Sequence, residues 1–195
     1  LSIVTAALAA RHAGFPGSFI DGNTATTWLA GLAFGVIGAA VVRDAPGNLL
    51  GPVMSVAGIL AAANATATEL ALLDARPLGA VSAWVASVLW LPAFLGLVLL
   101  LPLLYPFGHL PSRRWRWPFR IACASLGAAT LLVATTQDVV DSSGFSWAHN
   151  ALDLPLPDGP QLTVASILAA VCVLVAVAAA IGVILRMRRA DPEDR

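Results

Sequence analysis

The chain alternates apolar runs, each close to the length of a bilayer crossing, with short polar turns. A transmembrane helix needs about 20 consecutive apolar residues. The 195 residues are 58% hydrophobic and only 11% charged, whereas soluble domains carry about 25% charged residues. A water-soluble core cannot bury so much apolar surface, so we predict an all-α, polytopic transmembrane helix bundle. The predicted full spans cover residues 24–42, 49–73, 81–104, 119–137 and 162–185.

A further apolar stretch, residues 1–10, is too short to cross a bilayer. We interpret it as the outer end of a partial N-terminal span, with an interfacial stub as the alternative. Because the first residue is Leu1 rather than Met, we expect a chain trimmed at its N-terminus. The bundle then has five full spans and one partial span. Residues 1–189 form the predicted membrane domain, and residues 190–195 begin a cytoplasmic juxtamembrane linker.

Arginine predicts which way the spans are oriented, because short loops rich in arginine stay in the cytoplasm. The chain has eleven arginines and no lysine. Nine arginines fall on the side of the 106–118 loop and the C-terminal tail, against two on the other side. We therefore predict a multi-pass protein of a bacterial plasma membrane, with a cytoplasmic C-terminus and an external loop at residues 138–161. The lack of lysine in a chain rich in alanine is typical of a GC-rich bacterial coding sequence.

The loop at residues 105–118 is crowded with arginine and tryptophan. An arginine beside an anionic leaflet gains about 1 kcal/mol, and tryptophan favours the membrane interface. We predict that the loop anchors the bundle to anionic lipid headgroups. The predicted anchor residues are Arg113, Arg114, Trp115, Arg116, Trp117 and Arg120. Trp28, Trp84 and Trp147 mark the outer boundary in the same way, and packing inside the bundle is the alternative for every tryptophan.

Glycines line one face of the first full span. Gly31 and Gly35 have the spacing that lets a second helix approach closely, and Gly38 extends the face. A homodimer through such a face is one arrangement that the spacing allows.

The two cysteines, Cys123 and Cys172, are expected to be free small residues. The predicted spans put them at depths that differ by roughly 15 Å. A disulfide requires Cα atoms within about 7 Å, so the two thiols should not pair.

Four polar residues are candidates for sensing a ligand. Glu69 is the one acidic residue inside a predicted span, and intramembrane carboxylates are functional candidates. It lies about one turn from the outer surface, so our main interpretation is a solvated interfacial carboxylate. Thr66 lies on the same helical face, and Asn64 forms a second polar pair with Thr68. His149 in the external loop is a candidate for binding a cation or sensing acid.

Catalytic and metal-binding signatures are absent from the sequence. It contains no phosphate-binding glycine loop, no supported nucleophile and base pair, and no histidines and cysteines at ligand spacing. We therefore predict no catalytic residues, no metal, no cofactor and no nucleic-acid partner.

Two turns on the arginine-rich side carry a resemblance to a known family. Residues 105–116, Tyr-Pro-Phe-Gly-His-Leu-Pro-Ser-Arg-Arg-Trp-Arg, resemble a turn in the membrane sensor regions of actinobacterial two-component histidine kinases. Residues 43–51 are similar to the family's R-x-x-x-N-P-I-G segment, and residues 186–195 look like its juxtamembrane link. The longer turn departs from the family pattern at Phe107 and His109.

The resemblance implies a membrane-embedded input module for signal transduction, with a kinase core that would follow Arg195. The chain itself is then not expected to be an enzyme. Two alternatives stay open. One is an accessory or scaffold subunit of a membrane complex. The other is a small transporter, although Pro92 is the only mid-span break that we identify.

Overall fold

In the computed structural model, every regular element is a helix among the residues that the structure describes: Thr5, 23–72, 77–105, 108–110, 112–137, 140, 145, 147–150, 152 and 157–189. The helices are α2 (Asn23–Asp44), α3 (Leu50–Ala71), α4 (Leu78–Leu104), the short 3-10 helix η1 (Arg113–Trp115), α5 (Arg116–Ala134) and α7 (Asp158–Arg189). Five of them are long and apolar enough to cross a membrane. This confirms the predicted all-α bundle with five full spans, and the chain is a multi-pass membrane protein.

The partial N-terminal span is represented by one described residue, Thr5, which is helical and fully buried. The rest of residues 1–10 lies outside the described part of the chain, as does the predicted linker at residues 190–195.

Helices α5 and α7 differ most from their predicted limits. Helix α5 begins at Arg116 rather than at residue 119, because Pro118 is tolerated in the first turn, where a backbone N–H has no helical acceptor. Helix α7 has 32 residues, which at about 1.5 Å per residue is roughly 48 Å. It therefore exceeds the hydrocarbon thickness of about 30 Å. Helix α4 continues through Pro92 and Pro102, so the mid-span break that we identified at Pro92 is wrong.

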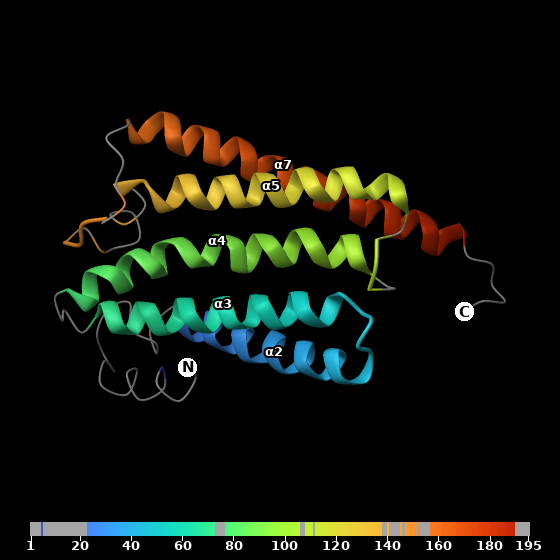
Figure 1. Ribbon diagram of the computed structural model, residues 1–195, viewed down its shortest axis with the longest axis horizontal. Helices are drawn as coiled ribbons and strands as arrows, with labels where there is room; N and C mark the ends of the chain where they lie inside the picture. Colours follow the sequence, from blue (N-terminus) through green and yellow to red (C-terminus); the bar gives the residue numbers. More distant parts are fainter. Residues whose placement is uncertain are drawn as a thin grey trace.

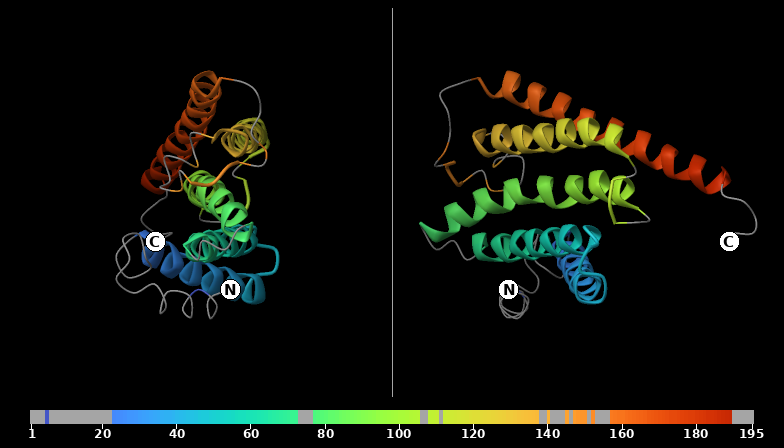
Figure 2. Two further views of the ribbon diagram at one scale, coloured as in Figure 1. Left: turned by 90° about the vertical axis from the view of Figure 1, so that its left-hand side faces the viewer. Right: turned by 45° about the vertical axis from the view of Figure 1, so that its right-hand side comes forward.

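Figure 1 shows the five long helices side by side, with their turns gathered at two ends. We call the end with the α2–α3 turn, the α4–α5 turn and the last residues of α7 the arginine end. The other end, where α3 passes to α4 and α5 passes to α7, is the opposite end. Helix α4 is the most buried span and contacts α3, α5 and α7. The right-hand view of Figure 2 shows α7 extending past its neighbours at the arginine end.

Glycines bring α2 and α3 into close contact. A Cβ atom added to Gly58 would lie 2.5 Å from the backbone nitrogen of Gly35, and one added to Gly38 would lie 2.5 Å from that of Ser55. Such distances leave no room for a side chain, so the two backbones pack directly. The predicted close approach at the glycine face is confirmed, and its partner is α3 of the same chain.

Three apolar clusters fill the rest of the bundle. The middle and arginine-end clusters join α4, α5 and α7, and they include Leu91, Val133, Leu99 and Cys172. The side chains that face outward are also apolar, among them Val36 (67% exposed) and Leu131 (70% exposed). A helix with apolar residues on its outer face is suited to lipid.

The depth predicted for the cysteines is wrong, although both thiols are free. The Cys172 Sγ donates a hydrogen bond of 3.3 Å to the carbonyl of Ala122, the residue beside Cys123. The prediction failed because α7 extends so far past the arginine end that its middle lies level with the first turns of α5. Cys123 points about 100° away from Ala122 around the helix, which keeps the thiols apart.

Candidate functional site

The polar residues near the end of α3 are mostly used in helix packing. The Asn64 amide donates a 2.6 Å hydrogen bond to the carbonyl of Ala86 on α4. The Thr66 hydroxyl donates to the carbonyl of Ala62 and lies 2.7 Å from the hydroxyl of Thr5. Since a hydroxyl has one hydrogen, Thr5 is the donor in that pair. Asn64 and Thr66, both predicted to sense a ligand, therefore join α3 to its neighbours.

Glu69 is fully buried, with 0% of its surface exposed. Our main interpretation, a solvated interfacial carboxylate, is wrong. Thr5 packs on Thr66, which shares a helical face with Glu69, whereas Ala67 and Ala71, which pack with Val140, Phe145 and Ala148, lie on the opposite face of α3. Packing around the end of α3 excludes water from Glu69, which the sequence alone did not show.

Residues from the α5–α7 connection fold back over the opposite end. Val140, Phe145 and Ala148 are buried against α3 and α4. The rings of Phe145 and Trp147 meet edge to face, with centroids 6.4 Å apart. His149 follows this buried segment and is exposed. The predicted candidates Glu69 and His149 thus lie at the same end, one buried and one accessible to solvent.

A hydrogen-bond network that we did not predict surrounds the last turn of α5. The carbonyl of Ala134 accepts hydrogen bonds from the Trp84 indole at 2.8 Å and from the Asn150 amide at 2.9 Å. The Gln137 side chain donates to the carbonyl of Ala148 and accepts from the backbone N–H of Asn150. Trp84 therefore joins helices inside the bundle, which was the alternative to its role as an interface marker.

The same network reaches α7 through Gln161, which is buried. The hydroxyls of Thr135 and Thr136 lie 3.2 and 3.5 Å from the Gln161 side-chain oxygen. The sequence feature that could have indicated this network is the Thr-Thr-Gln run at residues 135–137. Three polar residues at the end of an apolar helix need hydrogen-bond partners. The partners lie far along the chain, so the sequence did not identify them.

The two turns at the arginine end are joined to each other. The backbone N–H of Leu49 donates to the carbonyl of Gly108 at 2.9 Å. The Asn48 side chain accepts from the backbone N–H of Leu50 at 2.8 Å and lies against Gly108. Gly108 has a φ of 72°, and a Cβ atom there would collide with the Asn48 side chain. Glycine is required at this position for both reasons.

The predicted anchor residues separate into two groups. Five of the six are exposed, namely Arg113, Arg114, Arg116, Trp117 and Arg120. The Arg120 guanidinium lies 5.6 Å from the centre of the Trp117 ring. Trp115 is half-buried and packs against the arginine-end cluster. A Cβ atom on Gly182 of α7 would lie 3.5 Å from its indole ring. Trp115 is therefore a contact between the loop and α7.

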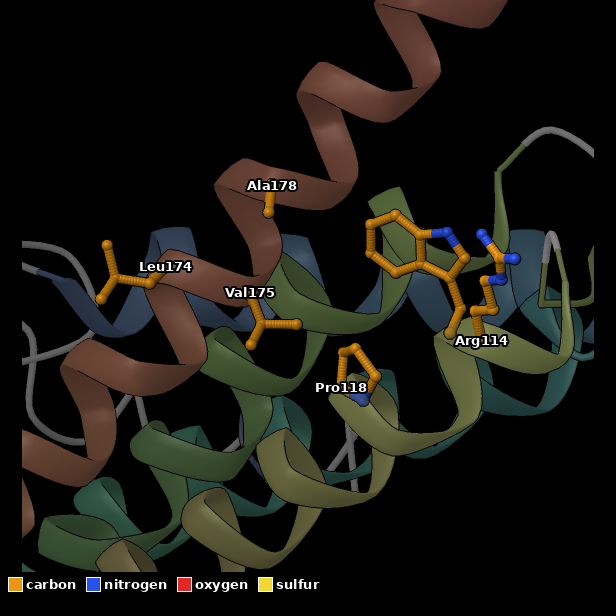
Figure 3. A pocket seen from close by; sticks show the side chains of 6 residues that line it. Arg114, Pro118, Leu174, Val175 and Ala178 are labelled. Atoms are coloured by element: carbon orange, nitrogen blue, oxygen red, sulfur yellow. The ribbon is translucent and has the colours of Figure 1, made fainter.

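An open pocket of about 470 Å³ lies beside this contact. Figure 3 shows Arg114 and Pro118 on one side of it and Leu174, Val175 and Ala178 of α7 on the other. Trp115 completes the lining, which is almost entirely apolar.

Within the described part of the chain, no group of three histidine, cysteine or acidic side chains is arranged to hold a metal ion. Comparison of the chain with protein-family models, with curated proteins and with solved structures found no match in any of the three. Function must therefore be argued from the residues and their contacts.

Proposed function

We propose that this chain is the membrane-embedded input module of a bacterial two-component sensor histidine kinase, with the arginine end in the cytoplasm. One observation carries the proposal. The two turns that resemble the family, 43–51 and 105–116, are far apart in the sequence but are joined by the hydrogen bond between Leu49 and Gly108. A shared contact explains why both segments would be needed for one function.

The contact between Trp115 and Gly182 supplies a path from these turns to α7. Helix α7 is the last span and extends past the other helices at the arginine end. A shift of the joined turns would move Trp115 against α7 and so displace the segment that leads out of the bundle. An input module needs such a link between its spans and its exit helix.

The opposite end is where a stimulus would act under this proposal. Asn64 and Thr66 are used in packing, so Glu69 and His149 are the remaining candidates. The segment that contains Thr5 contacts α3 at Thr66, on the helical face that carries Glu69. A stimulus that displaced this segment would expose a buried carboxylate, which gives the two states different free energies.

The experiment is to determine the codons after Arg195 and to assay the complete gene product for autophosphorylation by ATP in membranes. We expect a helix with a phosphate-accepting histidine followed by a nucleotide-binding domain. A stop codon directly after Arg195, without a kinase partner, would contradict the proposal. In that case substrate flux in liposomes would indicate a transporter, and a stoichiometric partner without kinase activity would indicate a scaffold subunit.

The same assay tests the coupling path. Trp115→Ala removes the contact with Gly182 and is expected to change the autophosphorylation rate severalfold. Trp90→Ala is the matched control, because Trp90 is exposed on α4 and is remote from the turns in the sequence. Equal autophosphorylation rates for the two variants would show that Trp115 does not transmit a shift of the turns to α7.

A further inference from the structure

The pocket between the start of α5 and α7 combines an apolar wall with a cationic rim. Its lining residues on α7 are Leu174, Val175 and Ala178, and Leu174 is 68% exposed. In a membrane-spanning helix, an exposed apolar wall is covered by acyl chains. Arg114 stands at the rim, and its side chain is also exposed.

Arg114, which lines the pocket, and the three other arginines of residues 113–120 have no acidic partner within the part of the chain that the structure describes. Arg113, Arg114, Arg116 and Arg120 form no ion pair with any side chain in the described ranges. The described acidic side chain at this end, Asp44, is paired with Arg43 at 2.8 Å. The rim therefore carries a concentrated positive charge that an anion can neutralise.

We propose that this pocket binds one anionic phospholipid, with the phosphate on Arg114 and one acyl chain on the apolar wall. The lining offers a cation for the phosphate and an apolar wall for the acyl chain, since Arg114 and the exposed α7 residues face the same cavity. A zwitterionic headgroup is disfavoured because its cation would meet the neighbouring arginines. The site is independent of any kinase activity.

Lipid binding can be measured on the purified full chain in a non-ionic detergent, by native mass spectrometry during titration with phosphatidylglycerol. We expect one tightly bound phosphatidylglycerol. Neither phosphatidylcholine nor inorganic phosphate should displace it. Displacement by inorganic phosphate would overturn the acyl-chain part of the site, and equal binding of the two lipids would overturn its charge selectivity.

Two variants and two matched controls locate the lipid. Arg114→Gln should weaken binding about fivefold, the effect of about one surface arginine, while Arg43→Gln should not. Ala178→Phe fills the pocket and should abolish tight binding, while Ala170→Phe, at an exposed position two turns earlier on α7, should not. Arg114→Gln changes only an exposed side chain, so it tests the site even if Ala178→Phe does not fold.

Binding of phosphatidylglycerol with the wild-type affinity by both Arg114→Gln and Ala178→Phe would overturn the proposal. So would a loss of dimers in Ala178→Phe without any loss of lipid, because the pocket would then be covered by a second copy of the chain. The failure of this site would leave the proposed input function untouched, since the two are measured separately.

Discussion

At the scale of single residues, Gly108 and Asn48 show how two turns are held together. The side chain of Asn48 satisfies the Leu50 N–H at the start of α3 and fills the space beside Gly108. The Gly108 carbonyl accepts from Leu49 at the same place. A residue with a Cβ at position 108 would be strained by the positive φ and would also displace Asn48.

Gly108→Ala is therefore expected to lower the free energy of unfolding by about 1–3 kcal/mol. Gly47→Ala is the control, because a Cβ on Gly47 meets no atom within 4 Å and its φ is not in the left-handed region. Unfolding by SDS in mixed micelles measures both. Equal stability of the two variants would show that the turns are not joined as described.

A second feature at the level of single residues is the hydrogen bonding of the buried polar side chains at the opposite end. Asn64, Thr136 and Asn150 are buried, and each has a partner on a backbone carbonyl. A polar group in a membrane interior is tolerated when it is hydrogen-bonded. Glu69 is buried at the same end.

At the scale of elements, α2 is attached to the bundle mainly through its contact with α3. Backbone atoms of Gly31 and Gly35 meet the position of a Gly58 Cβ at distances from 2.5 to 2.8 Å. Small residues permit such contact in membranes, where association depends on packing rather than on water exclusion.

Gly58→Ala should weaken this contact. Overpacking costs about 1–3 kcal/mol, which exceeds the helix-propensity gain of about 1 kcal/mol from replacing glycine. Gly35→Ala is the control on the facing helix, because a Cβ there meets no atom within 4 Å. SDS-induced unfolding should rank Gly58→Ala below the wild type and Gly35→Ala at or above it. The reverse order would mean that α2 and α3 do not pack through these glycines.

At the scale of the whole molecule, the arrangement of charge predicts an orientation. The two turns and the end of α7 share the arginine end (Figure 1), and nine of the eleven arginines lie on that side in the sequence assignment. The exposed residues Ser112 and His149 lie at the two different ends.

A variant with Cys123 and Cys172 replaced by alanine provides the background for labelling. Ser112→Cys should react with a membrane-impermeant maleimide only after cells are opened, and His149→Cys should react on intact cells. Detergent-permeabilised cells, in which both should react, are the control. Labelling of Ser112→Cys alone on intact cells would reverse the proposed orientation.

The class of the protein and the approximate positions of its spans could be predicted from local patterns in the chain. Apolar length and turn composition are local properties, because each helix satisfies its own backbone hydrogen bonds in lipid. For this reason the limits of α2 and α3 agree closely with prediction, whereas α5 begins three residues earlier, where Pro118 enters the first turn, and ends three residues earlier than predicted. The glycine face of α2 was also visible as local spacing.

Which residues contact one another could not be predicted from these local patterns and is seen in the folded chain. The burial of Glu69, the hydrogen-bond partner of Trp84 and the depth of Cys172 in the bundle all depend on segments distant in the chain. The contact of Asn48 with Gly108 and the pocket beside Trp115 arise in the same way. Periodicity shows which residues share a helical face but not how far one helix slides past another, and that offset fixes every contact between helices.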